Sequence, residues 1–405
     1  MTSDRPTLLS KRMYQRRGRR SSHMLDVTTA RRGTLTNIER LTSTIANGLY
    51  DAVLVMSPEN VPYYSGFYNM DLRSIPERVH LVIWPRDGEP AFVVTERRAE
   101  ALQPGDTFLS DIVPYQGEEL DSMRAVADTL ARMRVTSGRV GIEGRFFPAN
   151  HLRELQRLAP DVEFVDAFAY LESPRAIKTP AERDLLVQLA HWTTTAIDTA
   201  FAAAQVGDSE RSISARMQHE LLRNGADMIA LPVFAAGPRA GLFHPLATDM
   251  PVEAGMMVMT DFGGWKDGYF SDIARTAVMG RATDRQRDLY ARISDVKHAV
   301  VEFIKPGMPA SEVARFARAA YAARNLEFKW SIVGHSVGLG IHESPQIYPW
   351  VDDPILPGMV MMIELGYHDH PRDSIHVEDM VEITDRGAEY RTDFSRHETI
   401  WELGV

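Results

Sequence analysis

The chain has 405 residues and a formal net charge of −10, with 44% hydrophobic and 25% charged residues. This composition and a mean hydropathy of −0.23 predict a folded protein of two or three domains that does not span a membrane. Because the chain contains no cysteine, disulfides, thiolate metal sites and cysteine nucleophiles are excluded, and any metal must be held by histidine and carboxylate side chains.

The first 33 residues differ in charge from the rest. Residues 1–33 hold nine basic and two acidic residues, so the body of the chain is strongly acidic. An acidic body predicts no nucleic-acid partner, because phosphate binding needs a basic face. The arginine-rich composition is also that of an organellar transit peptide, but no apolar run follows the paired arginines as in an export signal. We therefore predict a disordered tail over 1–33 and a cytoplasmic protein.

The next part of the chain alternates helix and strand patterns. Spaced apolar residues predict a helix between Thr36 and Gly48. Further helices are predicted at 118–134 and 151–159. Apolar runs predict strands at 52–56, 80–84, 91–95 and 139–144, the second and third joined by a hairpin turn at Asp87-Gly88. This order predicts an α/β domain over residues 34–172.

The pattern changes at SPRAIKTP, which begins at Ser173. Two prolines and the capping residue Thr179 open a long helical run to about residue 204. Helices are also predicted at 209–224, 284–304 and 310–323, and strand-rich regions at 231–279 and 332–383. We expect an α+β domain over 173–405, in which helices cover one face of a largely antiparallel sheet.

Two aspartates mark a hairpin in the segment MVMTDFGGWKDGYFSDIARTAVMG. A strand over 257–260 leads to Asp261, a glycine-bearing turn is predicted over 263–268, and a returning strand over 269–276 carries Asp272. Such a hairpin can bring two carboxylates within a few ångströms, where they repel unless a cation lies between them. Alone, both could be solvated turn residues.

Two histidines and two glutamates further along the chain are also candidates for the same site. His335 and His342 stand in the glycine-rich segment IVGHSVGLGIHESP, where each alone could be structural. Glu364 and Glu378 lie in the apolar strand-like runs MVMMIELGY and SIHVEDMVEI, where a buried carboxylate needs a partner. The combination indicates a metal site.

The order Asp261, Asp272, His335, Glu364, Glu378 closely resembles the five-ligand dinuclear metal site of the creatinase, prolidase, aminopeptidase P and methionine aminopeptidase family. The resemblance covers nearly the whole chain, through TNIERL, SPENVPYYSGF, RAIKTPAERDLL, GHSVGLGIHESP and VEDMVEIT. It implies an α+β fold, with a pita-bread catalytic domain over 173–405 preceded by a smaller creatinase-type α/β domain over 34–172. It also implies a homodimer.

The same resemblance implies roles for individual residues. The five residues would hold two divalent ions (Mn, Co, Fe or Zn), with Asp272 and Glu378 bridging them. The implied catalytic residues are His244, His342 and Glu364, with Glu364 as proton shuttle. The predicted substrate-binding residues are His244, His342, His376 and Tyr367. Of these, Tyr367 is predicted from the polar cluster that follows Glu364, which could instead be a solvated loop.

We expect a metallohydrolase that cleaves a C–N amide bond through a metal-bridging hydroxide, with a short Xaa-Pro peptide as substrate. Proline-directed members commonly have Arg-x-Glu-Asp where this chain has His376-Val377-Glu378-Asp379. A fixed cation is thereby replaced by a titratable imidazole. The alternative is therefore a hydrolase, or a lyase, that acts on a small non-peptide substrate such as an osmolyte-like or ring amide. A non-enzymatic binding module is the alternative of another class.

Overall fold

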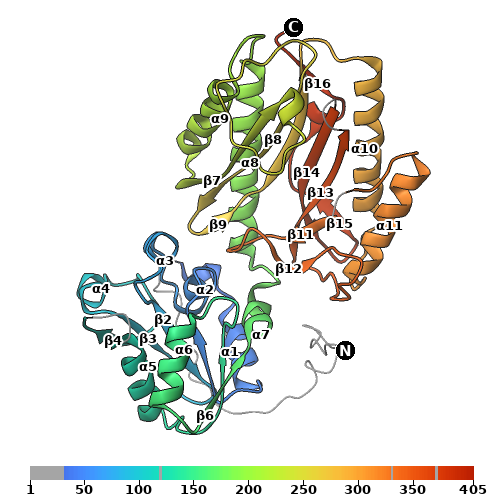
Figure 1. Cartoon of the computed structure of the whole chain (residues 1–405). Helices are drawn as coiled ribbons and strands as arrows, with labels where there is room; N and C mark the ends of the chain where they lie inside the picture. Colours follow the sequence, from blue (N-terminus) through green and yellow to red (C-terminus); the bar gives the residue numbers. More distant parts are fainter. Residues whose placement is uncertain (1–31, 118–120, 330–331, 370–372) are drawn as a thin grey trace. The chain divides into compact units, whose positions relative to one another are not determined.

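The structure is a computed structural model that describes residues 32–117, 121–329, 332–369 and 373–405. These residues form two compact units, divided between Arg175 and Ala176 (Figure 1). The tail predicted over 1–33 lies almost entirely outside the described residues. Among the helices that are described, none combines the length and the apolar character needed to cross a membrane.

The amino-terminal unit is built on a six-stranded mixed sheet with the order β4-β3-β2-β1-β5-β6. Its strands are β1 (Ala52–Val55), β2 (Leu81–Pro85), β3 (Ala91–Thr95), β4 (Asp111–Tyr115), β5 (Gly138–Ile142) and β6 (Val162–Asp166). Strands β2 and β3 pair antiparallel as the predicted hairpin, and Gly88 in their connection has a φ of 117°, which favours glycine. The α/β character predicted for this region is thus observed.

Helices cover this sheet and complete its core. They are η2 (Gly33–Leu35), α1 (Ile38–Ala46), α2 (Asn60–Ser65), α3 (Asp71–Ser74), α4 (Glu96–Ala101), α5 (Asp121–Arg132), α6 (Ala149–Leu158), α7 (Phe168–Glu172) and η3 (Ser173–Arg175). Met123 and Leu130 of α5 pack with Leu155 of α6 against the apolar side chains of the strands. This core lies entirely within the amino-terminal unit.

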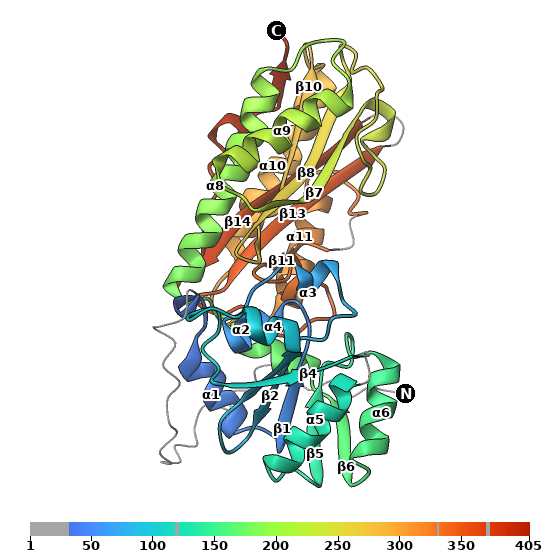
Figure 2. The same ribbon diagram turned by 90° about the vertical axis from the view of Figure 1, so that its left-hand side faces the viewer.

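The carboxy-terminal unit contains two sheets, whereas the sequence predicts one. One has the order β16-β10-β8-β7, with β9 paired to β8, and the other the order β12-β11-β13-β14-β15. The strands are β7 (Met228–Ala236), β8 (Met257–Lys266), β9 (Tyr269–Phe270), β10 (Ile273–Met279), β11 (Gly334–Ser336), β12 (Glu343–Gln346), β13 (Val360–Asp369), β14 (Asp373–Ile383), β15 (Ala388–Tyr390) and β16 (Trp401–Leu403). Strand β14 lies against β10 and β8, so the sheets meet along their long strands (Figure 2).

The helices of this unit divide between the two sheets. They are α8 (Pro180–Ala202), α9 (Glu210–Asn224), η4 (Gly237–Arg239), α10 (Asp284–Phe303), α11 (Ala310–Ala323) and η5 (Ser395–His397). Helices α8 and α9 contact β8 and β7, while α10 contacts β13 and β14 and packs with α11 (Figure 1). Thr179 caps α8 through a capping box with Glu182, as its place before Pro180 predicts.

The hairpin that carries the two aspartates has a tighter turn than the sequence predicts. Strand β8 continues through Gly263 and Gly264 to Lys266, and the turn is confined to Asp267 and Gly268. Gly263 stays in the strand because the chain returns directly over it: a Cβ there would lie 1.9 Å from the carbonyl oxygen of Ser271. Gly263 therefore allows β8 and the Ser271 segment to approach each other closely. Glycine is also common in turns, which is why the sequence predicted a turn at this position.

Alternation along β13 assigns its two faces. Met361, Ile363 and Leu365 belong to the apolar core that α10 and α11 cover. Because successive side chains of a strand point to opposite faces, Glu364 points away from that core. The helices thus bury one face of the sheet and leave the other for polar side chains.

Candidate metal centre

The two aspartates lie on adjacent segments of the β16-β10-β8-β7 sheet of the carboxy-terminal unit. Asp261 sits in the middle of β8, where it pairs with Ala274 of β10 and Val233 of β7. Asp272 occupies the break between β9 and β10. Their residues are only 6% and 3% exposed, so neither is the solvated turn residue considered above.

The β12-β11-β13-β14-β15 sheet supplies two glutamates and a histidine. Glu364 of β13 and Glu378 of β14 are direct partners in the antiparallel ladder, so their side chains share one face. His335 stands on β11, the neighbour of β13, opposite Met362. Its Nδ1 lies 3.1 Å from the carbonyl oxygen of Ser336, which directs Nε2 away from the backbone.

These five predicted ligands converge in the structure. Nε2 of His335 lies 3.5 Å from Glu378 Oε1, 3.8 Å from Glu364 Oε1 and 3.9 Å from Asp272 Oδ2. Asp261, Asp272 and Glu378 form a second group whose donor atoms lie within 4.8 Å of one another. Residues more than a hundred positions apart in sequence thus form one cluster.

Charge repulsion and burial perturb this cluster strongly. Burial and the charge of Glu378 raise the pKa of Asp272 well above its usual range. Burial is also the main cause that raises the pKa of Glu378 to about 7. For Glu364, the hydrogen bond from His376 and the charge of His335 outweigh burial and lower the pKa. The cluster holds more negative charge than its own histidines can balance.

The donor set fits divalent cations. Asp261 Oδ1, Asp272 Oδ1, Glu378 Oε1 and His335 Nε2 are buried atoms without a hydrogen-bond partner among the described residues. A buried polar atom without a partner is costly, and coordination would offset that cost. Four carboxylates and one imidazole form an oxygen-rich set that suits Mn, Fe, Co or Zn.

The two other predicted histidines approach the cluster from separate segments. The His342 ring lies 4.0 Å, centroid to centroid, from the His335 ring. His244 Nε2 lies 3.8 Å from Asp261 Oδ2, and half of its side chain is exposed. Its ring is stacked at 4.0 Å with Phe243, which is 88% exposed. Both histidines are therefore at the border of the centre, and an exposed aromatic ring stands beside one of them.

The remaining predicted substrate residues, His376 and Tyr367, have different surroundings. His376 is buried, and its Nε2 lies 3.3 Å from Glu364 Oε2, inside the cluster. Tyr367 lies on the opposite face of β13 from Glu364 and packs against the apolar core. The structure therefore brings His376 together with the five ligands but does not bring Tyr367 to them.

Comparison with known proteins places the chain in a family. The model of metallopeptidase family M24 matches residues 184–385, and the model of the creatinase/prolidase N-terminal domain matches residues 37–177. An Xaa-Pro dipeptidase of Pyrococcus horikoshii is 30% identical over 259 residues, which cover 64% of this chain and 74% of that protein. The chain belongs to metallopeptidase family M24.

Other M24 relatives match over a greater length. An Xaa-Pro dipeptidase of Pyrococcus furiosus is 27% identical over 363 residues, which cover 89% of this chain and 98% of that protein. The solved prolidase structure from Pyrococcus furiosus has a TM-score of 0.73, 27% identity, and coverage of 85% and 96% of the two chains. A dipeptidase structure from Mycobacterium ulcerans has a TM-score of 0.80 at 23% identity, covering 91% and 98%. The predicted fold, a creatinase-type domain followed by a pita-bread domain, is confirmed.

A buried charge network that was not predicted from the sequence holds the strand residue next to the ligand Glu378. Asp379, next to Glu378, accepts hydrogen bonds from Arg275 and Thr392 at 2.7 Å each and pairs with Lys297. Arg275 also donates to the backbone carbonyl of Glu378 at 2.7 Å. Burial would raise the pKa of Asp379, but the two cations outweigh it and lower the pKa to about 2. An arginine in the apolar run IARTAV was the one sequence signal of this network.

A second missed network holds the segment that contains His342. Glu343 accepts a hydrogen bond from the backbone of Gly340 at 2.9 Å and forms an ion pair with Lys178 at 2.9 Å. Both side chains of the pair are 1% exposed. The glycine-rich turn before His342 is therefore fixed by a buried carboxylate, which positions the histidine at the border of the centre.

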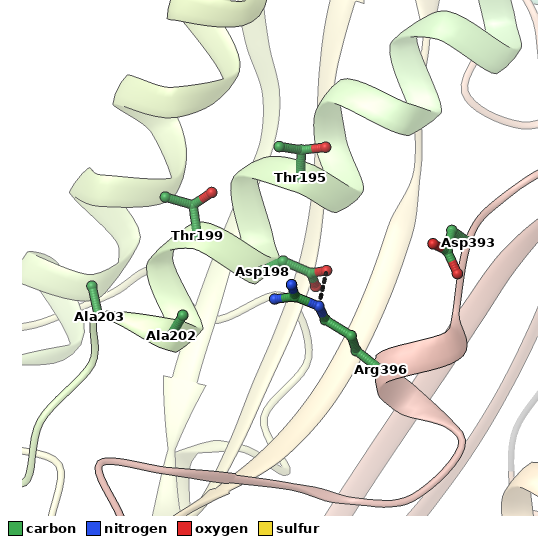
Figure 3. A pocket seen from close by; sticks show the side chains of 7 residues that line it. All are labelled: Thr195, Asp198, Thr199, Ala202, Ala203, Asp393 and Arg396. Carbon is green, nitrogen blue, oxygen red and sulfur yellow. Dashed lines mark ion pairs between the residues drawn. The ribbon is translucent and has the colours of Figure 1, made fainter.

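A hollow of about 550 Å³ lies elsewhere on the same unit (Figure 3). It is lined by Thr195, Asp198, Thr199, Ala202 and Ala203 of α8 and its end, and by Asp393 and Arg396. Arg396 pairs with Asp198 at 3.9 Å, and the buried His397 is hydrogen-bonded to Asp198 at 2.8 Å. These contacts fasten the carboxy-terminal segment to α8, and none of the lining residues belongs to the metal centre.

Proposed function

We propose that this chain is a metal-dependent Xaa-Pro dipeptidase or aminopeptidase, which hydrolyses the C–N amide bond that precedes proline. The observation that carries the proposal is the convergence of Asp261, Asp272, His335, Glu364 and Glu378 in one buried cluster. The relatives named Xaa-Pro dipeptidase support the peptide substrate. We further propose that the five residues hold two divalent ions.

The chemistry divides between the ions and the chain. Divalent ions, when bound, supply Lewis acidity and lower the pKa of a water molecule. Glu364 would accept the proton of the attacking water and deliver it to the leaving nitrogen. His244 and His342 would hold the substrate between them at the border of the cluster. Burial and the charge of His335 lower the pKa of His342 to about 4, so near pH 7 this ring is a neutral hydrogen-bond donor toward the substrate carbonyl.

A small non-peptide amide is the second candidate substrate. The observation that favours it is the position of His376 beside Glu364, where the resemblance commonly implies an arginine. The homodimer, a divalent ion drawn from Mn, Co, Fe or Zn, and the cytoplasmic location inferred from the sequence remain predictions of this proposal.

Metal content and peptide cleavage, measured together, test the proposed function. Protein purified without chelator is analysed by plasma mass spectrometry, and Gly-Pro, Ala-Pro and the non-proline control Gly-Ala are assayed with added Mn²⁺ or Co²⁺. We expect about two ions per chain and cleavage restricted to the proline peptides. Two bound ions without peptide cleavage would favour the small non-peptide amide as substrate. A chain that binds no metal would refute the proposed function.

A further inference from the structure

We infer that His376 is a sixth protein ligand of the metal centre, which binds a divalent ion of the Mn, Fe, Co or Zn class through Nε2. The inference rests on the proposed metal centre and goes beyond it, because the family resemblance implies five ligands with a single imidazole. It also changes the role expected for His376 from substrate binding to metal binding.

The register of the β13–β14 ladder places His376 beside the ligands. His376 and Glu378 are two residues apart on β14, so their side chains leave the same face of the strand. Glu364 pairs with Glu378, and the adjacent same-face rung pairs Gly366 with His376. Because Gly366 has no side chain, the imidazole meets no cross-strand side chain on its own rung and has room to turn toward Glu364.

The contacts of the ring support coordination. His376 is 4% exposed, and its Nε2 lies 3.3 Å from Glu364 Oε2. Glu364, His376 and Glu378 form a group whose donor atoms all lie within 4.8 Å of one another. His335 Nε2 faces the other oxygen of Glu364, Oε1, at 3.8 Å. The two imidazoles therefore approach opposite oxygens of one carboxylate, as the ligands of two neighbouring ions would.

The backbone of His376 is fixed independently of its ring. Thr276 Oγ1 accepts a hydrogen bond from the His376 amide at 2.9 Å and donates one to the His376 carbonyl at 2.9 Å. This pair of bonds joins β10 to β14 at the level of the metal centre. A polar side chain substituted at position 376 should leave the strand in place, so the ring can be tested by itself.

The test counts imidazoles on Co²⁺ bound to the full-length chain. Imidazole N–H protons of a Co²⁺ ligand give strongly shifted proton NMR signals that disappear in D₂O. We expect the signal of His376 in addition to that of His335. His376→Gln should remove one shifted signal and weaken the binding of one of two Co²⁺ ions at least about tenfold. His368→Gln is the matched control on the same hairpin: His368 contacts Ser374 at 3.2 Å and should keep every shifted signal.

The outcomes separate this inference from the proposed function. Two bound Co²⁺ ions with a set of shifted signals that His376→Gln leaves unchanged would overturn the inference and leave the metal centre standing, with His376 as a hydrogen-bond partner of Glu364. A chain that binds no Co²⁺ would refute the proposed function itself. If His376→Gln does not fold, X-ray absorption on the wild-type Co²⁺ protein decides, because an average of only half an imidazole per ion overturns the inference.

Discussion

Asp272, like Glu378, belongs to two of the three donor groups. It belongs to the group with His335 and His342 and also to the group with Asp261 and Glu378. A carboxylate shared in this way can bridge two ions, so its loss should affect both rather than one.

We therefore expect Asp272→Ala to lose both metal ions and all peptidase activity while remaining folded. Plasma mass spectrometry gives the metal content, and circular dichroism gives the fold. Asp249→Ala is the control, because Asp249 forms an exposed ion pair with Arg211 at 2.7 Å and should keep metal and activity. Full metal occupancy in Asp272→Ala would contradict the bridging role.

Glu182 gives a prediction about pH at the residue scale. It accepts hydrogen bonds from the Thr179 amide and the Tyr269 hydroxyl, and burial raises its pKa to about 7. Because its unfolded pKa is near 4.5, the native state binds the proton more tightly, and this stability is lost as pH rises from about 4.5 through 7. The loss amounts to about 3.5 kcal/mol at most, from about 1.4 kcal/mol per pKa unit.

We expect Glu182→Gln to remove this part of the pH dependence. The amide oxygen can accept from Thr179, and the amide nitrogen can donate to the Tyr269 hydroxyl oxygen. Urea unfolding between pH 5 and 8 should show a smaller decline in the free energy of unfolding than the wild type. The exposed Glu253→Gln should follow the wild type, and equal slopes for Glu182→Gln and wild type would count against the assignment.

At the scale of elements, the close approach of β8 and the Asp272 segment shapes the centre. A Cβ on Gly263 would meet the Ser271 carbonyl oxygen at 1.9 Å and the Asp272 amide nitrogen at 3.5 Å. These are backbone atoms, which cannot move aside as a flexible side chain can. The strand carrying Asp261 and the segment carrying Asp272 can be this close only with glycine at position 263.

We expect Gly263→Ala to separate the two aspartates, lower the free energy of unfolding by about 1–3 kcal/mol and weaken Co²⁺ binding. Thermal unfolding and Co²⁺ titration measure the two effects. Gly207→Ala is the control: its added Cβ meets nothing within 4 Å, so strain from its φ of 93° should lower stability without changing metal affinity. Unchanged Co²⁺ affinity in Gly263→Ala would oppose this account.

Elements with local signals were predictable, and those that depend on strand pairing were less so. Thr179 and Thr283 begin α8 and α10 with capping boxes. A capping box involves residues only three positions apart, so it can be recognised from the sequence. The turn after Asp261 was predicted too wide, because the contact that keeps Gly263 in a strand comes from Ser271. Tyr367 was assigned to the site from its nearness to Glu364 in sequence, although alternation puts it on the other face.

At the scale of the whole molecule, each unit has its own apolar core. One apolar cluster of the carboxy-terminal unit is formed by residues between Ala176 and Ile400, and one of the amino-terminal unit by residues between Ala52 and Val162. All seven residues of the three donor groups lie in the carboxy-terminal unit. A unit with its own core and its own ligands should fold and bind metal by itself.

We expect a fragment of residues 176–405 to unfold cooperatively and to bind as many Co²⁺ ions as the full chain. Circular dichroism during heating and plasma mass spectrometry measure the two properties, with the full-length chain as reference. Gradual unfolding, or a smaller Co²⁺ stoichiometry, would show that the amino-terminal unit is needed to complete the centre.

The sequence by itself determined the fold class, the family resemblance and the five predicted ligands, because these depend on residue types in a fixed order along the chain. Only the tertiary structure decided the position of His376 within the cluster and the network of Arg275, Asp379 and Lys297 beneath it. The network joins β10 and α10 to β14, which lies 104 residues from Arg275 and 82 residues from Lys297 at Asp379, and its distances depend on strand register and helix packing. A motif records which residues are present, whereas register and packing decide which of their atoms meet.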